Sequence, residues 1–327
     1  MAEFNYIEFQ RTRDFSNKMN ATFEFLKQNF KSFFKSVLYL AGPPAVVSSL
    51  LMGSVFSAYM SLAVGMASPG GQDAFQDYLT SFSLWGNVIL VVVLTTITIV
   101  MLTATVNGYV VLYREKQSNK IEVEEVWAQV KKTFWGYFFT LVGYFMLFVI
   151  GYLLLIAIVF GAAAVSPGLS VIIAFGLFGA FVYVLVGASL IYAIQGFEGK
   201  GFFSAINRSF YLIRGKWWST FGLLFVMTLI IYIVSFIFII PWYISFIVQT
   251  MHSIETREFT SDNSMSWFAI LSIGVYYLVY YLLTSVPQLA LVFQYFNLVE
   301  MKESKGLIEQ MENMGTAEQP QQHKEDY

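Results

Sequence analysis

Six long stretches of the chain contain no Asp, Glu, Lys, Arg or His residue. A mostly apolar stretch of 18 or more residues is long enough to cross a bilayer as a helix, which takes about 20 residues. The six stretches cover residues 37–67, 82–113, 133–168, 169–197, 217–250 and 265–299. Charged residues make up 12% of the chain, about half the share of a soluble domain, and the alternation of a membrane β-barrel is absent. We therefore predict an all-α polytopic membrane protein with six transmembrane helices.

The basic residues lie almost entirely on one side of the predicted bilayer. Six Lys or Arg residues lie in 1–36, five in 114–132, four in 198–216 and three in 301–327, whereas only Arg257 lies in an opposite loop. Cytoplasmic loops of membrane proteins carry the excess of Lys and Arg. We therefore expect a multi-pass protein of the cell membrane, taken to be the bacterial cytoplasmic membrane, with both termini in the cytoplasm.

This topology divides the chain into three parts. Residues 1–36 are predicted to form a cytoplasmic N-terminal segment with an amphipathic helix, and residues 37–300 a six-helix transmembrane domain. Residues 301–327 are predicted to form a cytoplasmic tail, whose polar end, GTAEQPQQHKEDY, is typical of disorder.

One sequence pattern occurs three times, each time where the chain enters the membrane from the cytoplasm. A lysine is followed within two residues by a pair of large aromatics in NFKSFFKSVLY (29–39), VKKTFWGYFFT (130–140) and IRGKWWSTFGL (213–223). An amphipathic stretch with helical spacing precedes or overlaps each copy, with apolar faces formed by Phe23, Leu26, Phe30, Phe33 and Val37, by Val123, Val126, Trp127, Val130 and Phe134, and by Phe203, Ile206, Phe210 and Ile213. We therefore predict three parallel hairpin repeats, each preceded by an interfacial amphipathic helix, around an axis along the membrane normal.

Lysines of these segments are candidate lipid contacts at the inner leaflet. When an amphipathic helix lies in the interface, its lysines face the headgroups and are attracted by anionic lipid. The candidates are Lys27, Lys31, Lys35, Lys132 and Lys216. We expect membrane lipids as partners, preferentially anionic ones, and a membrane or cytoplasmic protein as a further partner. The net charge of −2 indicates no nucleic-acid partner.

Seven small residues recur every four positions in the first apolar stretch. They are Ala41, Ala45, Ser49, Gly53, Ser57, Ser61 and Gly65. Small residues at this spacing allow helix backbones to approach closely in lipid. Because four residues turn a helix by about 400°, the row drifts around the helix and marks a diagonal groove. It predicts a tight contact between two helices.

Two groups of uncharged polar residues lie inside the predicted bilayer, one in the second apolar stretch and one in the sixth. They are Thr96, Thr103 and Asn107, and Tyr276, Tyr277, Tyr280 and Tyr281. Buried hydroxyl groups need hydrogen-bond partners. Two interpretations remain open: hydrogen bonds between helices, or an intramembrane polar cavity for a neutral or amphiphilic ligand.

Residue types that carry enzyme chemistry are sparse. The chain has no cysteine, which excludes disulfides and thiolate metal ligands. Its two histidines, His252 and His323, have no convergent set of further ligands or catalytic groups around them. We therefore expect no catalytic residues, no cofactor, no metal site and no enzyme activity.

Two longer segments resemble a known family. They are RTRDFSNKMNATFEFLKQNFK (11–31) and SAINRSFYLIRGKWWSTFGLLFVMTLI (204–230). They are similar to a bacterial six-helix membrane domain that precedes some glycerophosphodiester phosphodiesterases, and to related uncharacterised stand-alone inner-membrane proteins. The resemblance covers about residues 15–300 and implies a helical membrane domain. It implies no phosphodiesterase activity, because no soluble segment is long enough for the catalytic barrel.

Three classes of function remain for such a chain. An accessory or scaffold protein of the cytoplasmic membrane is favoured, because it needs only packed helices and cytoplasmic surfaces for partners. The alternative is a carrier or binder of a neutral or lipid-like substrate, since ion-coupled transport usually uses ionisable residues within the membrane and the six stretches contain none. An intramembrane enzyme is the least favoured, because acid–base chemistry needs titratable groups.

Overall fold

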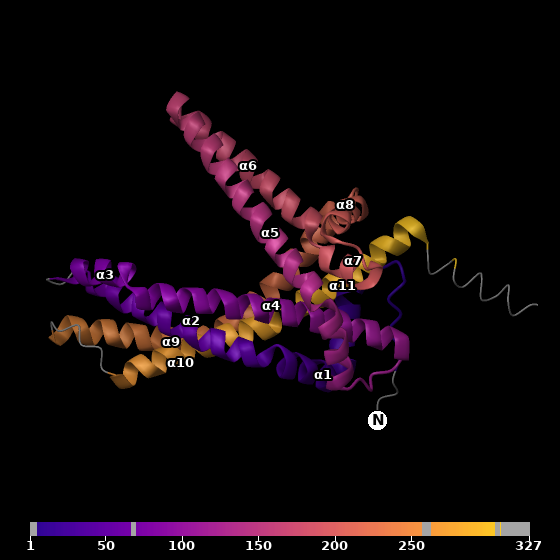
Figure 1. The fold of residues 1–327 in the computed structure, drawn as a ribbon, viewed down its shortest axis with the longest axis horizontal. Coiled ribbons are helices and arrows are strands. Elements are labelled where there is room, and N and C mark those ends of the chain that lie inside the picture. Colours follow the sequence, from indigo (N-terminus) through magenta and orange to yellow (C-terminus); the bar gives the residue numbers. More distant parts are fainter. Residues whose placement is uncertain (1–4, 67–69, 257–262, 305–307, 309–327) are drawn as a thin grey trace, which may run out of the picture.

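The computed structural model describes residues 5–66, 70–256, 263–304 and 308. Within these residues the chain forms eleven α-helices and no strand (Figure 1). The helices are α1 (Phe15–Leu40), α2 (Gly42–Gly65), α3 (Gly71–Thr80), α4 (Phe82–Lys116), α5 (Val123–Val165), α6 (Pro167–Ala188), α7 (Ile191–Glu198), α8 (Phe202–Ile213), α9 (Trp217–Thr256), α10 (Asn263–Leu283) and α11 (Ser285–Glu303). Six helical stretches in this part of the chain are long and apolar enough to cross a membrane. The prediction of an all-helical integral membrane protein is thus confirmed.

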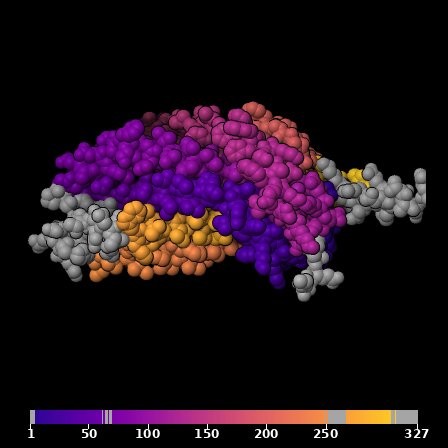
Figure 2. Space-filling view, turned by 60° about the horizontal axis from the view of Figure 1, so that its bottom comes forward, coloured from indigo at the N-terminus to yellow at the C-terminus, as the bar shows by residue number. Residues whose placement is uncertain are grey.

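The long helices form three hairpins, α2–α4, α5–α6 and α9–α10. The first and third run side by side, and the α5–α6 hairpin diverges from them. α2 packs against both α4 and α10, and α9 packs against α10. Figure 2 shows α2 between α4 and α10 on one face of the molecule. The α5–α6 hairpin leaves this group at an angle (Figure 1). α5 still packs against α4, whereas α6 touches α9 only slightly.

The main hydrophobic core lies at one end of the molecule, where all three hairpins begin and end. α4, α7 and α11 contact one another there, and a further helix packs across each neighbouring pair. α1 packs on α11 and α4, the start of α5 on α4 and α7, and α8 on α7 and α11. We call this unit the platform: α1, residues 100–116 of α4, residues 123–137 of α5, and the whole of α7, α8 and α11.

The apolar faces predicted for the first and third amphipathic segments are only partly buried in the protein. In α1, Phe23 and Phe30 are 41% and 60% exposed, whereas Phe25 is fully buried. In α8, Phe203 is 77% exposed and Leu212 is buried. Both helices carry apolar side chains on the exposed side as well as on the side that packs in the platform. Exposed apolar side chains suit a helix that lies in the membrane interface, and the interfacial placement of these two helices stays a prediction.

The second amphipathic segment is not a separate helix, which corrects the expectation of a separate interfacial helix before each hairpin. α5 runs through the predicted interfacial helix and the third span as one helix of 43 residues. The other two junctions contain helix breakers, since Pro43 and Pro44 open α2 and Gly215 has a φ of +83° between α8 and α9. Residues 130–134 (VKKTF) contain neither Gly nor Pro, so nothing interrupts the helix there.

Two of the spans that return to the platform are broken before they reach it. Between α6 and α7, the hydroxyl of Ser209 donates to the carbonyl oxygen of Gly187 at 2.6 Å and accepts from the amide of Leu190 at 3.3 Å. This hydroxyl replaces part of the helical hydrogen bonding that the break removes. Between α10 and α11 the helix is interrupted at Thr284, because Pro287 has no N–H to bond the preceding turn.

The row of small residues on α2 faces its neighbours, as predicted. Ala41, Ala45, Ser49 and Gly53 are all buried, and Gly53 packs against Gly274 of α10. The tight helix–helix contact is therefore confirmed for this part of the row. The structure does not describe the side chains at positions 61 and 65 of the row.

Candidate functional site

All five basic residues predicted as lipid contacts lie on the molecular surface. Lys27, Lys31 and Lys35 lie on α1, Lys132 on α5 and Lys216 between α8 and α9. Trp127, Trp135 and Trp218 are also exposed on the same segments. Exposed tryptophans and lysines together are typical of the membrane–water interface. The surface of the platform thus has the composition expected of an interfacial region.

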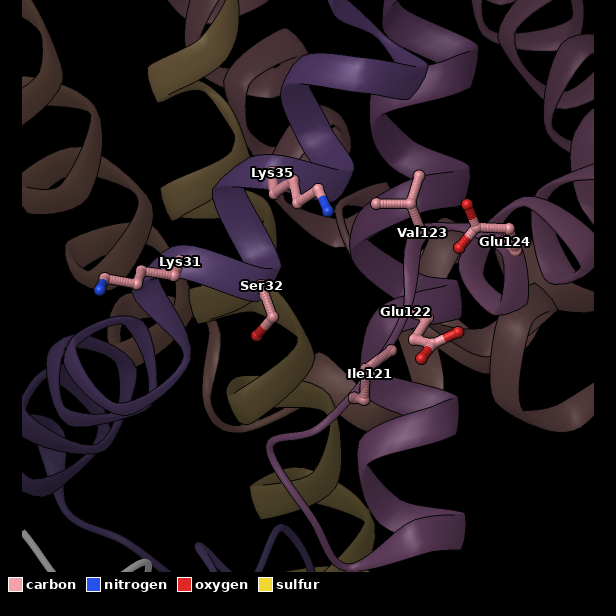
Figure 3. Close-up of a pocket in the computed structure, with 7 residues that line it drawn as sticks. All are labelled: Lys31, Ser32, Lys35, Ile121, Glu122, Val123 and Glu124. Atoms are coloured by element: carbon pink, nitrogen blue, oxygen red, sulfur yellow. The ribbon is translucent and has the colours of Figure 1, made fainter. Parts of the chain in front are cut away.

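A groove opens between α1 and the start of α5. Its volume is about 350 Å³. It is lined by Lys31, Ser32 and Lys35 on one side and by Ile121, Glu122, Val123 and Glu124 on the other. Figure 3 shows the side chain of Lys35 directed towards the 121–124 segment, and that of Lys31 directed the other way. We call this feature the α1–α5 groove.

Hydrogen bonds hold the two sides of the α1–α5 groove together beneath it. The Oγ atom of Ser32 lies 2.5 Å from the hydroxyl of Tyr109 on α4, which in turn donates to Oδ1 of Asn29 at 3.2 Å. Ser32 also lies 3.3 Å from the carbonyl oxygen of Asn119, in the loop that leads to α5. Three segments of the chain therefore fix the position of Ser32.

Opposite charges line the α1–α5 groove without pairing. Glu125, one residue beyond it, is engaged, because it forms an ion pair with Lys116 and accepts from the amide of Glu122 at 3.1 Å. The side chains of Glu122 and Glu124 are exposed. Among the ion pairs of the described residues, none joins Lys31 or Lys35 to either of these glutamates. Glu122 also caps α5, because its side chain accepts from the backbone amide of Glu125, which leaves one of its two carboxylate oxygens for a ligand. Lys35 and Glu124 have no ion-pair partner among the described residues.

Lys18, which the sequence assigned only to the basic N-terminal segment, is buried in the platform and 2% exposed. Its ammonium donates to Oε1 of Gln294 at 2.7 Å and to Oγ of Ser219 at 2.9 Å. Burial lowers the pKa of Lys18 to about 8; the charge of Lys216 lowers it further and that of Asp14 opposes the change. These contacts join α1, α9 and α11, so Lys18 holds helices together rather than contacting lipid.

A charged cluster joins α7, α8 and α11. Oε1 of Glu198 accepts from Nε of Arg208 at 3.0 Å and from the hydroxyl of Tyr295 at 3.0 Å. Lys200 lies 2.7 Å from Oε2 of Glu198, and Arg208 also pairs with Glu303. Because these partners are all within the platform, the cluster stabilises the platform and leaves little capacity for a ligand.

The predicted intramembrane polar residues occupy separate places along α4. Thr103 and Asn107 are buried at the platform end, where Nδ2 of Asn107 donates to the carbonyl oxygen of Thr103 at 2.9 Å. Thr96 is half-buried farther along α4. The hydroxyl of Tyr281 lies 3.1 Å from Oγ1 of Thr95 and links α10 to α4. Thr95 is about three helical turns from Asn107, so Tyr281 contacts α4 near Thr96 and far from Asn107.

The other three tyrosines of α10 pack against neighbouring helices. Tyr280 lies beside Tyr232 of α9, with 5.6 Å between ring centroids. Tyr276 and Tyr277 pack on a small cluster around Trp242. These contacts favour interhelical packing as the role of the tyrosines. The cavity interpretation stays a prediction.

Sequence reasoning identified one side of the α1–α5 groove and missed the other. The lysine spacing on α1 indicated Lys31 and Lys35. Nothing local indicated Ser32 or residues 121–124, because their proximity depends on contacts such as that between Ser32 and Asn119, which are 87 positions apart. Glu122 and Glu124 were the sequence signal for the second side of the groove. They lie in the 114–132 loop, which was considered only for its basic residues.

Comparison of the chain with protein-family models, with curated proteins and with solved structures finds no match. The resemblance of residues 11–31 and 204–230 to a six-helix membrane domain therefore stays a prediction.

Proposed function

We propose that this chain is an accessory or scaffold protein of the bacterial cytoplasmic membrane, with the platform and both termini on the cytoplasmic side. The distribution of charge supports this orientation. The platform carries the exposed lysines, whereas α3, at the opposite end (Figure 1), has Asp73 and Asp77 and no basic residue. Basic residues concentrate on the cytoplasmic side of membrane proteins. The proposal includes no enzyme activity, cofactor or nucleic-acid partner.

The cyclic packing of the platform is the observation that carries the proposal. Each hairpin contributes one segment to the centre, from α4, α7 or α11, and one to the rim, from α1, the start of α5 or α8. We interpret the three pairs as parallel repeats around an axis along the membrane normal. Such an arrangement gathers the inner ends of all three hairpins into one packed body. A body of this kind offers partner proteins a fixed surface while the spans anchor it.

The rim of the platform supplies the contacts to lipid in this proposal. The exposed lysines of α1, α5 and the α8–α9 junction would each gain about 1 kcal/mol near an anionic surface. The exposed tryptophans on the same segments suit the headgroup level. The pattern in residues 204–230, which spans α8 and the start of α9, supports membership of the six-helix membrane-domain family as part of the same proposal.

Replacement of Lys27, Lys31 and Lys35 by Gln tests the proposal. The variant, purified gently from membranes, should retain less anionic lipid than the unchanged chain. Alternatively, it should lose a cytoplasmic partner protein that the unchanged chain keeps. Replacement of Asp73 and Asp77 by Asn is the control, since it removes charge at the opposite end. If the triple variant keeps both its lipids and its partners, the platform surface has no such role.

A second candidate function is the carriage of a neutral or lipid-like substrate. The divergence of α6 from α9 favours it. α2 packs on α10 and α5 on α4, whereas α6 and α9 touch only slightly and run apart (Figure 1). In liposomes with fluorescent phospholipid in both leaflets, a carrier would expose the inner-leaflet dye to an external quencher. A scaffold would leave the inner half protected.

A further inference from the structure

We propose that the α1–α5 groove binds the headgroup of a zwitterionic phospholipid, one that carries a primary ammonium next to its phosphate. Lys35 contacts the phosphate, and Glu122 and Glu124 contact the ammonium. This inference rests on the proposed function, which places the platform at the inner leaflet. It adds a defined site and a headgroup class to the general attraction of anionic lipid.

The distribution of charge in the groove selects the ligand. Lys35 extends across the groove towards the segment that holds both glutamates (Figure 3). A purely anionic headgroup there would meet two carboxylates, and a simple cation would meet the lysine. A zwitterion places each of its charges beside an opposite one, and discrimination between ligands then comes from both attraction and repulsion. The unpaired charges described for the groove become paired on binding.

The size and surroundings of the groove suit a lipid. Its volume of about 350 Å³ is at the lower end of the range for small-molecule sites, which fits a headgroup without its acyl chains. Exposed apolar side chains adjoin it: the ring of Tyr39 lies 5.8 Å from the ammonium of Lys35, and Leu38 and Trp127 are exposed. Acyl chains would lie along these side chains while the headgroup occupies the groove.

The ammonium determines which phospholipids the groove prefers. A primary ammonium has three N–H groups that donate to carboxylates. Phosphatidylethanolamine has this group, whereas the quaternary ammonium of phosphatidylcholine has no N–H, and phosphatidylglycerol has no cation. We therefore expect the full-length protein, in nanodiscs made from an equal mixture of the three, to retain phosphatidylethanolamine preferentially when it is extracted and its lipids are measured by mass spectrometry.

Variants on the two sides of the groove should change retention differently. Glu122→Gln with Glu124→Gln should lower the ratio of phosphatidylethanolamine to phosphatidylglycerol by roughly three- to fivefold for each carboxylate that contributes. Lys35→Gln should lower the retention of both lipids. Asp77→Asn is the control and should change the retention of neither lipid, because Asp77 lies on α3 at the opposite end of the molecule (Figure 1). Since Glu122 precedes the first residue of α5, Glu124→Gln alone serves as the variant that leaves the helix start intact.

An unchanged lipid ratio in both glutamate variants would overturn the headgroup assignment. If the triple lysine variant still lost anionic lipid in that case, the proposed function would stand and only the groove would lose its role. If position 120 instead faced the outside of intact cells, the proposed function itself would fail, and the groove could not meet the inner leaflet.

Discussion

Gly53 of α2 lies so close to α10 that a Cβ atom added to it would stand 2.5 Å from the carbonyl oxygen of Ile270. Such a distance is shorter than any van der Waals contact, and the nearest group is backbone, which cannot rotate away. The two helices can therefore approach this closely only with glycine at position 53. Because lipid supplies no hydrophobic force between helices, close backbone packing of this kind is a main source of their association.

Replacement of Gly53 by Leu should force α2 and α10 apart. Overpacking of this kind costs about 3 kcal/mol, and we expect a clear fall in the melting temperature of the protein in detergent. Gly86→Leu is the control, since an added Cβ at Gly86 on α4 meets nothing within 4 Å. Equal melting temperatures for the two variants would show that the α2–α10 contact is loose.

Replacement of Ser209 by Ala should loosen the joint between α6 and α7. The variant leaves the amide of Leu190 and the carbonyl of Gly187 without this partner, at a cost of about 2 kcal/mol. Hydrogen exchange at residues 186–191 should rise, and the melting temperature should fall. Ser204→Ala, on the exposed side of the same helix, should change neither. Protection that is unchanged in the Ser209 variant would mean that another group bridges the break.

The stability of the protein should depend on pH through Lys18. Its pKa of about 8 in the folded chain is below the ordinary value of 10.5, so the folded chain releases this proton at a lower pH than the unfolded chain. The cost of burying the charge is then fully present below about pH 8 and diminishes as the pH rises towards about 10.5. Wild type should therefore gain melting temperature relative to Lys18→Met between about pH 7.5 and 9.5.

A matched control for this measurement is Lys27→Met, at an exposed position of the same helix. Its melting temperature relative to wild type should not change across the same pH range. A constant difference between wild type and Lys18→Met would show that the Lys18 ammonium is solvated in the folded protein.

The orientation of the chain can be tested directly because it contains no cysteine. A membrane-impermeant maleimide should label Asp77→Cys in intact cells, since α3 is expected to lie outside. It should label Lys120→Cys only after the cells are opened. Labelling of position 120 in intact cells would mean that the platform faces outwards.

The spans were predictable because hydrocarbon restricts the composition of every residue that crosses it. The second apolar stretch was expected at 82–113, and α4 covers Phe82–Lys116. The boundary between the third and fourth spans was placed at residue 168, and the structure has it at Ser166, just before Pro167. Proline is favoured at the first position of a helix, so this signal was present in the sequence.

Other parts of the fold had no comparable signal. α3 is short and polar, and its residues lie between the first two predicted spans without an apolar pattern of their own. The central packing of α4, α7 and α11 joins segments from three different hairpins, and no periodicity within one segment indicates its neighbour. For the same reason the exposed lysines of the candidate site could be predicted from their spacing on α1, whereas Glu122 and Glu124 could be placed opposite them only with the structure.

The hydrogen bond between Lys18 and Gln294 joins α1 to α11 across 276 positions. At a synthesis rate of about 5–20 residues per second, the nascent chain needs roughly 14 to 55 seconds to cover that distance. During this time α1 has no α11 to cover its buried face, so the platform cannot be completed until the last of the described spans has been made. A chain truncated within α10 would be inserted but unfinished, and the uncovered face of α1 would mark it for membrane proteases.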